Sequence, residues 1–414
     1  MEGEGTLLPI TYRPIVLFSI GVLGWALDLF ILQKCGIDPI SLLQLHQTDK
    51  HIPLHQPIFF LSGILGAISC ASLALFWHLK SPSIAVLPYL LALLLLIWPG
   101  RSFYRKERLR FTRALRRVLS LNIFSPVFFS DIILADMLTS FSNVFGDLFI
   151  ASCVFVAGYN SSFFMDNTEN IYYRDIAVPL LISTPYLIRL KQCIAEYIES
   201  KEKRHVFNAL KYASSLPVVI FSAVQRKAAI YITETGSVPH HWYLKEDTIF
   251  RFWIMFVFIN SMYSFWWDIS MDWNLISVQL DPTQVQEQPT LKHPKVIRHQ
   301  PQTSTPIVHF RRQLYFSQPF WYVLSIFFDF LLRITWSLKL SSHIYLRKLD
   351  GSIFLMELLE VFRRWMWVIF RLESEWVKKV YNSLPNAAFE NLRMDLLDRR
   401  SSGTLSPIVE EEDP

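Results

Sequence analysis

Long apolar stretches, separated by shorter polar connections, set the pattern of this chain. A helix needs about 20 mostly apolar residues to cross the hydrocarbon core of a membrane, and several stretches reach that length. The candidate spans are residues 14–33, 57–78, 83–100, 131–158, 171–190, 206–225, 248–270, 319–340 and 352–373. Some of them are short or carry charges. The pattern therefore predicts an all-α fold, a multi-pass transmembrane helical bundle of about 8–10 spans.

Basic residues indicate how such a bundle is oriented. Lys and Arg gather in segments 101–117, 191–205 and 274–318, which follow the third, fifth and seventh candidate spans. The positive-inside rule places connections of this kind on the cytosolic side. We therefore expect these three connections and the C-terminus in the cytosol, and the N-terminus in a lumen or outside the cell.

Composition agrees with a membrane protein and argues against an enzyme. The 414 residues are 52% hydrophobic and only 18% charged, which is rare for a soluble domain of this size. The four cysteines show neither metal-ligand spacing nor a disulfide framework. No Ser–His–Asp pattern or phosphate-cradling glycine loop is evident, with 13 glycines in the chain. We expect no catalytic residues, no cofactor and no metal.

The chain divides into three parts. Residues 1–100 hold the N-terminal transmembrane helices, residues 101–380 a second transmembrane domain, and residues 381–414 a tail predicted to be disordered and cytosolic. Residues 281–306 are rich in Pro, Gln and Thr and predict a flexible cytosolic loop. Residues 101–121 interleave Arg with apolar side chains, which is typical of a helix on an anionic membrane surface rather than of a nucleic-acid interface.

Two carboxylates stand out at the end of the seventh span. Asp268 and Asp272 lie four residues apart in the tryptophan-rich run 266–273, so they share one face of a helix. An aspartate at the centre of a membrane helix costs about 2.5–3.5 kcal/mol on insertion scales. One interpretation is that they cap the helix in the interfacial belt, where Trp is common. The other is a polar site that faces the interior of the bundle.

Further charges lie inside later spans. Asp329 and Arg333 are four residues apart, and Glu360 is within one turn of both Arg363 and Arg364. Each set taken alone fits an internal salt bridge or a cation that reaches toward the membrane surface. Together they favour a functional site, because a bundle that needed only stability would fill these positions with apolar residues.

Five separated motifs recur over roughly residues 100–380: Leu134-Ala135-Asp136, Lys211-Tyr212, Trp267 to Trp273, Leu332 to Trp336, and Glu360 to Trp365 with its continuation to Glu373. In order and spacing these motifs resemble the EXS domain family. This family contains eukaryotic phosphate exporters that also serve as retrovirus receptors, and fungal ER-retention-defective (ERD-type) Golgi proteins. The exporters carry a cytosolic SPX domain ahead of the membrane part. Only a short segment precedes the first span here, so the chain resembles the short ERD-type branch.

The resemblance implies roles for named residues. The phosphate-binding set is Lys211, Tyr212, Arg333, Arg363 and Arg364. The supporting carboxylates are Asp136, Asp268, Asp272 and Glu360. Trp336 is the implied gate. Four cations and four carboxylates balance to zero formal charge, which allows a bound anion to leave again.

The resemblance also implies a biological role. We expect a Golgi membrane protein, with the endoplasmic reticulum as the alternative location, that is needed to retain ER lumenal proteins and for Golgi glycosylation. It would act by moving inorganic phosphate from the Golgi lumen to the cytosol. The alternative is a trafficking adaptor that recycles glycosyltransferases or retention receptors without transport. Expected partners are inorganic phosphate, membrane lipids, and Golgi glycosyltransferases or coat and recycling adaptors, with no nucleic acid. A homodimer is left open.

Overall fold

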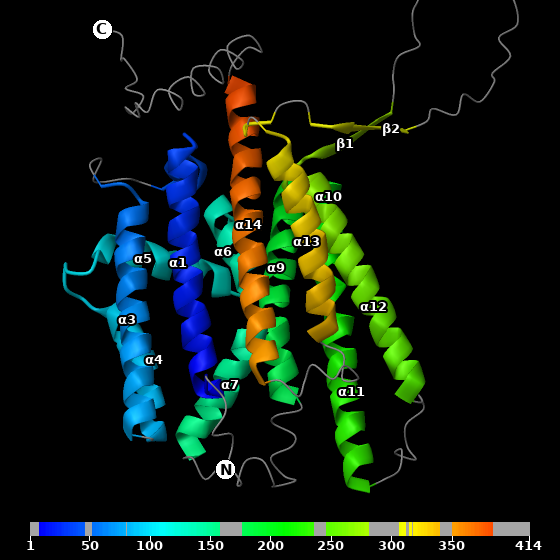
Figure 1. Ribbon diagram of the computed structural model, residues 1–414. Coiled ribbons are helices and arrows are strands. Elements are labelled where there is room, and N and C mark those ends of the chain that lie inside the picture. The colour runs from blue at the N-terminus through cyan, green and yellow to red at the C-terminus, as the bar shows by residue number, and fades with distance from the viewer. Residues whose placement is uncertain are drawn as a thin grey trace, which may run out of the picture.

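The computed structural model describes residues 8–45, 52–79, 81–157, 176–235, 246–280, 306–311, 314–316, 318–339 and 350–383. These residues are mostly helical and form a bundle (Figure 1). The helices are η1 (Ile10–Tyr12), α1 (Arg13–Lys34), α2 (Pro39–Leu42), α3 (His55–Leu79), η2 (Pro82–Val86), α4 (Leu87–Ile97), α5 (Arg105–Leu119), α6 (Phe129–Ser140), α7 (Ser142–Ala157), α9 (Val178–Ser200), α10 (Lys203–Ala213), α11 (Ser215–Thr235), α12 (Glu246–Trp267), the π-helical turn η5 (Asp268–Asp272), α13 (Phe320–Lys339) and α14 (Asp350–Ser383). The strands are β1 (Ile276–Leu280) and β2 (Pro306–Phe310).

The predicted class, a helical bundle with several membrane-spanning helices, is confirmed. By length and composition, four stretches of helix can cross a membrane: Ile10–Lys34, His55–Leu79, Lys203–Ala228 and Asp247–Asp272. Helices α6 and α7 make a fifth if they count as one span, bent by 63°. The other candidate spans correspond to α4, α9, α13 and α14, which are short or carry charged side chains.

A short antiparallel sheet is the feature that the apolar pattern did not predict. Strand β1 pairs with β2, from Ile276 opposite Phe310 to Leu280 opposite Pro306. The sheet lies at the same end of the bundle as the C-terminal end of α14 (Figure 1). The predicted flexible loop 281–306 falls outside the described residues except for Pro306. Of the predicted tail 381–414, the first three residues continue α14, and the rest lies outside the described residues.

The apolar interior gathers where α1, α6, η5, α13 and α14 meet. Trp273 and Trp367 are buried at its centre, with Tyr322 and Phe370 beside them. Other large apolar side chains face outward, among them Leu90 of α4 and Phe258 of α12. Exposed apolar faces of this kind are typical of contact with membrane lipid. The pattern therefore separates a packed centre from a lipid-facing exterior.

Helix α5 (Arg105–Leu119) is attached to the bundle by two arginines. Arg108 is buried and donates to carbonyl oxygens at the end of α4 and in the following turn, including those of Leu95 at 2.7 Å and Trp98 at 2.9 Å. Arg117 forms a two-point ion pair with Asp131 of α6 at 2.6 and 2.7 Å. The hydrogen bond to Asp131 raises the pKa of the Arg117 guanidinium. Two of the basic residues in this segment are therefore structural.

Gly24 allows α1 to pack closely against α14. A Cβ atom at this position would overlap the indole ring of Trp365. Because packed interiors tolerate extra volume poorly, we expect Gly24→Ala to lower the free energy of unfolding by about 1–3 kcal/mol. The measurement is the midpoint of thermal unfolding of the purified protein in detergent.

Gly63→Ala is the matched control for this substitution. Gly63 lies inside α3, and nothing stands within 4 Å of a Cβ built there. Alanine is the better helix former, so this variant is expected to melt at the same temperature or slightly higher. Equal melting temperatures for the two variants would show that the α1–α14 contact does not depend on Gly24.

Candidate anion site within the helix bundle

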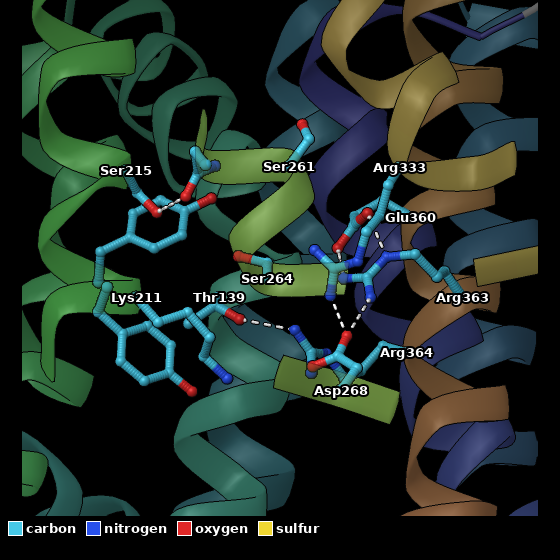
Figure 2. A pocket seen from close by; sticks show the side chains of 13 residues that line it. Thr139, Lys211, Ser215, Ser261, Ser264, Asp268, Arg333, Glu360, Arg363 and Arg364 are labelled. Atoms are coloured by element: carbon cyan, nitrogen blue, oxygen red, sulfur yellow. Dashed lines mark hydrogen bonds and ion pairs between the residues drawn. The ribbon is translucent and has the colours of Figure 1, made fainter. Parts of the chain in front are cut away.

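A cavity of about 60 Å³ lies among the helices. Near it, the helical path of the chain is interrupted in three places. Helices α6 and α7 meet at a bend, α11 begins at Ser215, and α12 passes into the π-helical turn η5 at Asp268. A single buried water needs about 10–15 Å³, so the cavity has room for several waters or a small ion. Its lining is shown in Figure 2 and consists of Thr139, Tyr186, Lys211, Tyr212, Ser215, Asn260, Ser261, Ser264, Asp268, Arg333, Glu360, Arg363 and Arg364.

One side of the cavity is built from arginines and carboxylates that hold each other in place. Arg333 of α13 is ion-paired with Asp268, and its Nε lies 3.1 Å from an oxygen of Asp329. Arg363 of α14 lies 3.1 Å from the other oxygen of Asp329 and forms a two-point contact with Glu360, at 2.6 and 3.0 Å. The predicted i,i+4 pair of Asp329 and Arg333 is confirmed. These contacts fix both guanidinium planes, so the site is pre-organised.

Arg364 and Lys211 are less fully neutralised than the other two cations. Arg364 donates to two hydroxyl groups, Ser140 Oγ at 2.8 Å and Thr139 Oγ1 at 3.0 Å, and it forms no ion pair within the described part of the chain. The Nζ of Lys211 is 3.6 Å from an oxygen of Asp272. A buried positive charge with weak pairing attracts an anion, because the anion replaces the water that the charge has lost.

Asp136 and Asp272, two of the predicted supporting carboxylates, lie outside the cavity lining. Asp136 accepts a hydrogen bond from Tyr212 and pairs with Arg189 of α9, whose Nε is 2.8 Å away. Asp272 lies between Lys211 and Arg371, at 3.6 and 3.8 Å. Both acids therefore act on groups that surround the cavity. The side chain of Trp336, the predicted gate, lies outside what the structure describes.

Sequence reasoning missed Arg189, which is 2% exposed. It donates to Asp136 and to the side-chain oxygen of Gln192 at 2.6 Å, and its guanidinium lies over the ring of Tyr212. A signal for it was present, because Arg189 falls inside the candidate span 171–190, where an ionisable residue is costly unless it has a partner.

A neutral wall of amide and hydroxyl groups was missed as well. It comes from α11 and α12 and includes Ser215, Asn260, Ser261 and Ser264. Ser214 and Ser215 both donate to the side-chain oxygen of Asn260, at 2.9 and 3.0 Å. Single serines in an apolar helix are common, so nothing in the sequence marked these as members of one site. The cavity thus has a charged side and a hydroxyl-rich side.

The charges that line the cavity favour an anion. Four cations and two carboxylates reach the lining, which leaves two positive charges in excess (4 − 2 = 2). Counting Asp329, which contacts two of the arginines, leaves one. Within the described residues, no group of three or more His, Cys, Asp or Glu side chains is placed to hold a metal ion. The arrangement suits a small oxyanion that accepts several hydrogen bonds.

Comparison with known proteins gives one family. The model of the EXS family matches residues 8–377, which includes the N-terminal helices. The chain is 28% identical over 378 residues to "Protein ERD1 homolog 1" of Schizosaccharomyces pombe, covering 89% of this chain and 90% of that protein. It is 26% identical to "Solute carrier family 53 member 1" of Mus musculus and to "Xenotropic and polytropic retrovirus receptor 1 homolog" of Xenopus laevis, covering 87% of this chain in both cases.

The chain spans about half the length of the mouse and frog relatives, 48% of each, and nearly all of the fission yeast one. The predicted resemblance to the EXS family, with ERD-type and exporter-type relatives, is confirmed. The chain belongs to the EXS family.

Proposed function

We propose that this chain carries inorganic phosphate across an intracellular membrane, from the Golgi lumen to the cytosol. The observation that carries the proposal is the buried cavity with Lys211, Arg333, Arg363 and Arg364 in its wall. Guanidinium groups offer paired, planar donors that match the oxygens of phosphate, and a lysine adds a compact charge. Similarity to a mouse protein named as a solute carrier supports a transport role.

The partial neutralisation of the cations supports transport rather than permanent binding. Asp268, Glu360 and Asp329 already occupy Arg333 and Arg363, so an incoming phosphate competes with carboxylates that are part of the protein. A conducting site has to bind its ion strongly enough for entry and weakly enough for exit. The carboxylates that already pair with the arginines lower the affinity of the site for phosphate, so the ion can both enter and leave.

The interrupted helices also support a transport site. Binding sites of secondary transporters commonly lie where discontinuous helices meet inside the bundle. Here α6 and α7 bend by 63° beside Thr139, and α12 changes to a π-helical turn at Asp268. Turns of this kind expose backbone and side-chain groups to a cavity, and π-helical turns are frequent at functional sites.

In the Golgi, this activity would remove the phosphate that glycosylation produces. Glycosyl transfer from nucleotide sugars in the lumen leads to the release of phosphate, which needs an outlet. Poor glycosylation and loss of ER lumenal proteins would follow indirectly when the outlet fails. Similarity to a fission yeast protein named as an ERD1 homologue supports this assignment.

The test is release of phosphate from liposomes that contain the purified chain. Phosphate-loaded vesicles with protein should lose phosphate faster than protein-free vesicles, measured with a phosphate sensor in the outer solution. Inert vesicles that hold folded protein, together with normal ER-protein retention in cells that carry only Arg363 variants, would instead favour the trafficking adaptor.

A further inference from the structure

Asp268 is one of two carboxylates in the cavity lining, which otherwise consists of cations, hydroxyl groups and one amide. Its Oδ2 atom accepts from Arg333 and lies 3.7 Å from Arg363. Its Oδ1 atom accepts no hydrogen bond within the described part of the chain. Figure 2 shows this carboxylate next to the two guanidinium groups and on the cavity, and the residue is 2% exposed.

The other acidic group of the lining has its oxygens engaged. Glu360 accepts two hydrogen bonds from Arg363 and one from Ser140, at 2.6 to 3.0 Å. The side-chain oxygen of Asn260 accepts from Ser214 and Ser215. A carboxylate oxygen has two lone pairs, and no residue in the described part of the chain donates to Oδ1 of Asp268. Asp268 is ion-paired with Arg333, and a carboxylate in such a pair offers only acceptors.

A tetrahedral oxyanion meets this acceptor differently according to whether it carries a hydrogen. At neutral pH inorganic phosphate and arsenate keep at least one hydroxyl group, which can donate to a carboxylate. Sulfate and perchlorate keep none, so one of their oxygens would face Oδ1 of Asp268 with repulsion instead of a hydrogen bond. A buried acceptor that the ligand leaves unpaired is costly, and a buried repulsion costs more.

We propose that Asp268 is the specificity-determining residue of the cavity: its Oδ1 atom accepts a hydrogen bond from the hydroxyl group of a protonated oxyanion, which selects phosphate and arsenate and excludes sulfate. This inference rests on the proposed function of phosphate transport. The arginines and Lys211 attract any small anion, and Asp268 favours the binding of those anions that carry a hydroxyl group. Arsenate is a substrate of the same site, because it has the shape and the hydroxyl groups of phosphate.

The experiment compares competing anions in the phosphate-release assay. Arsenate, sulfate and perchlorate are each added to liposomes that contain the full chain, at equal ionic strength. Arsenate is expected to inhibit release about 10- to 100-fold more strongly than sulfate, the size expected for one hydrogen bond to a charged group. Perchlorate, which is monovalent and has no hydrogen, is expected to behave like sulfate, which separates the effect of the hydrogen from that of charge.

Asp268→Asn tests the residue itself. Arg333 still needs an acceptor, so the amide oxygen is expected to face Arg333 and the amide nitrogen to face the cavity, which turns the acceptor into a donor. The ratio of the inhibition of phosphate release by arsenate to that by sulfate should then fall at least about tenfold. Asp28→Asn is the matched control: Asp28 of α1 is equally buried, lies outside the cavity lining, and should leave the difference unchanged.

The outcomes separate this inference from the proposed function. Absence of phosphate release by the unmodified chain would overturn the transport function. Phosphate release that sulfate or perchlorate inhibits as strongly as arsenate would overturn the inference alone, and this result does not depend on any variant. A folded Asp268→Asn protein that still distinguishes arsenate from sulfate would overturn it as well.

Discussion

Replacement of Arg363 by alanine is expected to lower phosphate release from loaded liposomes by about 100-fold or more. Arg363 reaches the cavity and contacts three carboxylates, with its Nη1 atom 3.1 Å from Asp329 and its Nη2 atom 2.6 Å from Glu360. Without the guanidinium the site loses a main donor to phosphate. All three carboxylates also lose a partner, and the excess positive charge that attracts the anion falls.

Loss of folding must be separated from loss of transport in this experiment. Removal of one partner of a buried ion pair costs about 3–5 kcal/mol, so Arg363→Ala is expected to melt at a lower temperature. Arg363→Lys keeps the charge but not the paired donors, and it should retain part of the stability and little of the transport.

Arg117→Ala is the control for breaking a two-point ion pair with a buried aspartate elsewhere in the bundle. Arg117 contacts Asp131 at 2.6 and 2.7 Å, away from the cavity lining. The rate of phosphate release per amount of folded protein should be the same for this variant as for the unmodified chain. Normal release by folded Arg363→Ala protein would contradict the assigned site.

Replacement of Arg189 by methionine is expected to lower the free energy of unfolding by about 3–5 kcal/mol. Arg189 and Asp136 are each 2% exposed, and the change leaves a charged carboxylate in the bundle without a guanidinium. Tyr212, which donates to Asp136 and lies under the Arg189 guanidinium, loses its fixed position at the cavity. The measurement is thermal unfolding in detergent, followed by phosphate release from the folded fraction.

The double variant Arg189→Met with Asp136→Asn tests the cause. Removing both charges should recover part of the lost stability, because no unpaired charge remains buried. Arg110→Met is the comparison for a partly exposed pair, since Arg110 and Glu107 are each 19% exposed, and it should change stability by less than about 1 kcal/mol. A single Arg189→Met variant as stable as the double variant would show that the unpaired carboxylate of Asp136 is not the cause of the lost stability.

The sequence allowed most of the helices to be predicted, because apolar length is a local property. A run such as 57–78 becomes helix α3 wherever it packs, since a membrane leaves few alternatives for an apolar segment. The pairing of β1 with β2 could not be predicted in the same way. Residues 276–280 and 306–310 lie about 30 positions apart, and their register depends on contacts across that distance.

The candidate site was predicted in part. The resemblance implied a phosphate-binding set, and the structure places all of its members in the lining of one cavity: Lys211, Tyr212, Arg333, Arg363 and Arg364. The motifs did not indicate which carboxylates line it. Charge alone does not show whether an aspartate faces the cavity or a second cation, and Asp136 faces Arg189 because α6 packs against α9.

By itself the sequence determined the class of this protein, the approximate positions of its helices and the family, because these depend on composition, local periodicity and short motifs. The cations of the site were predicted from the resemblance to that family. Only the tertiary structure decided that Asp268 and Glu360 line the cavity while Asp136 and Asp272 stand behind it, that Arg189 completes the network, and that serines of α11 and α12 form the neutral wall. The physical reason is that burial, ion pairing and hydrogen-bond capacity depend on which helices meet, and that is settled by packing between segments far apart in the chain.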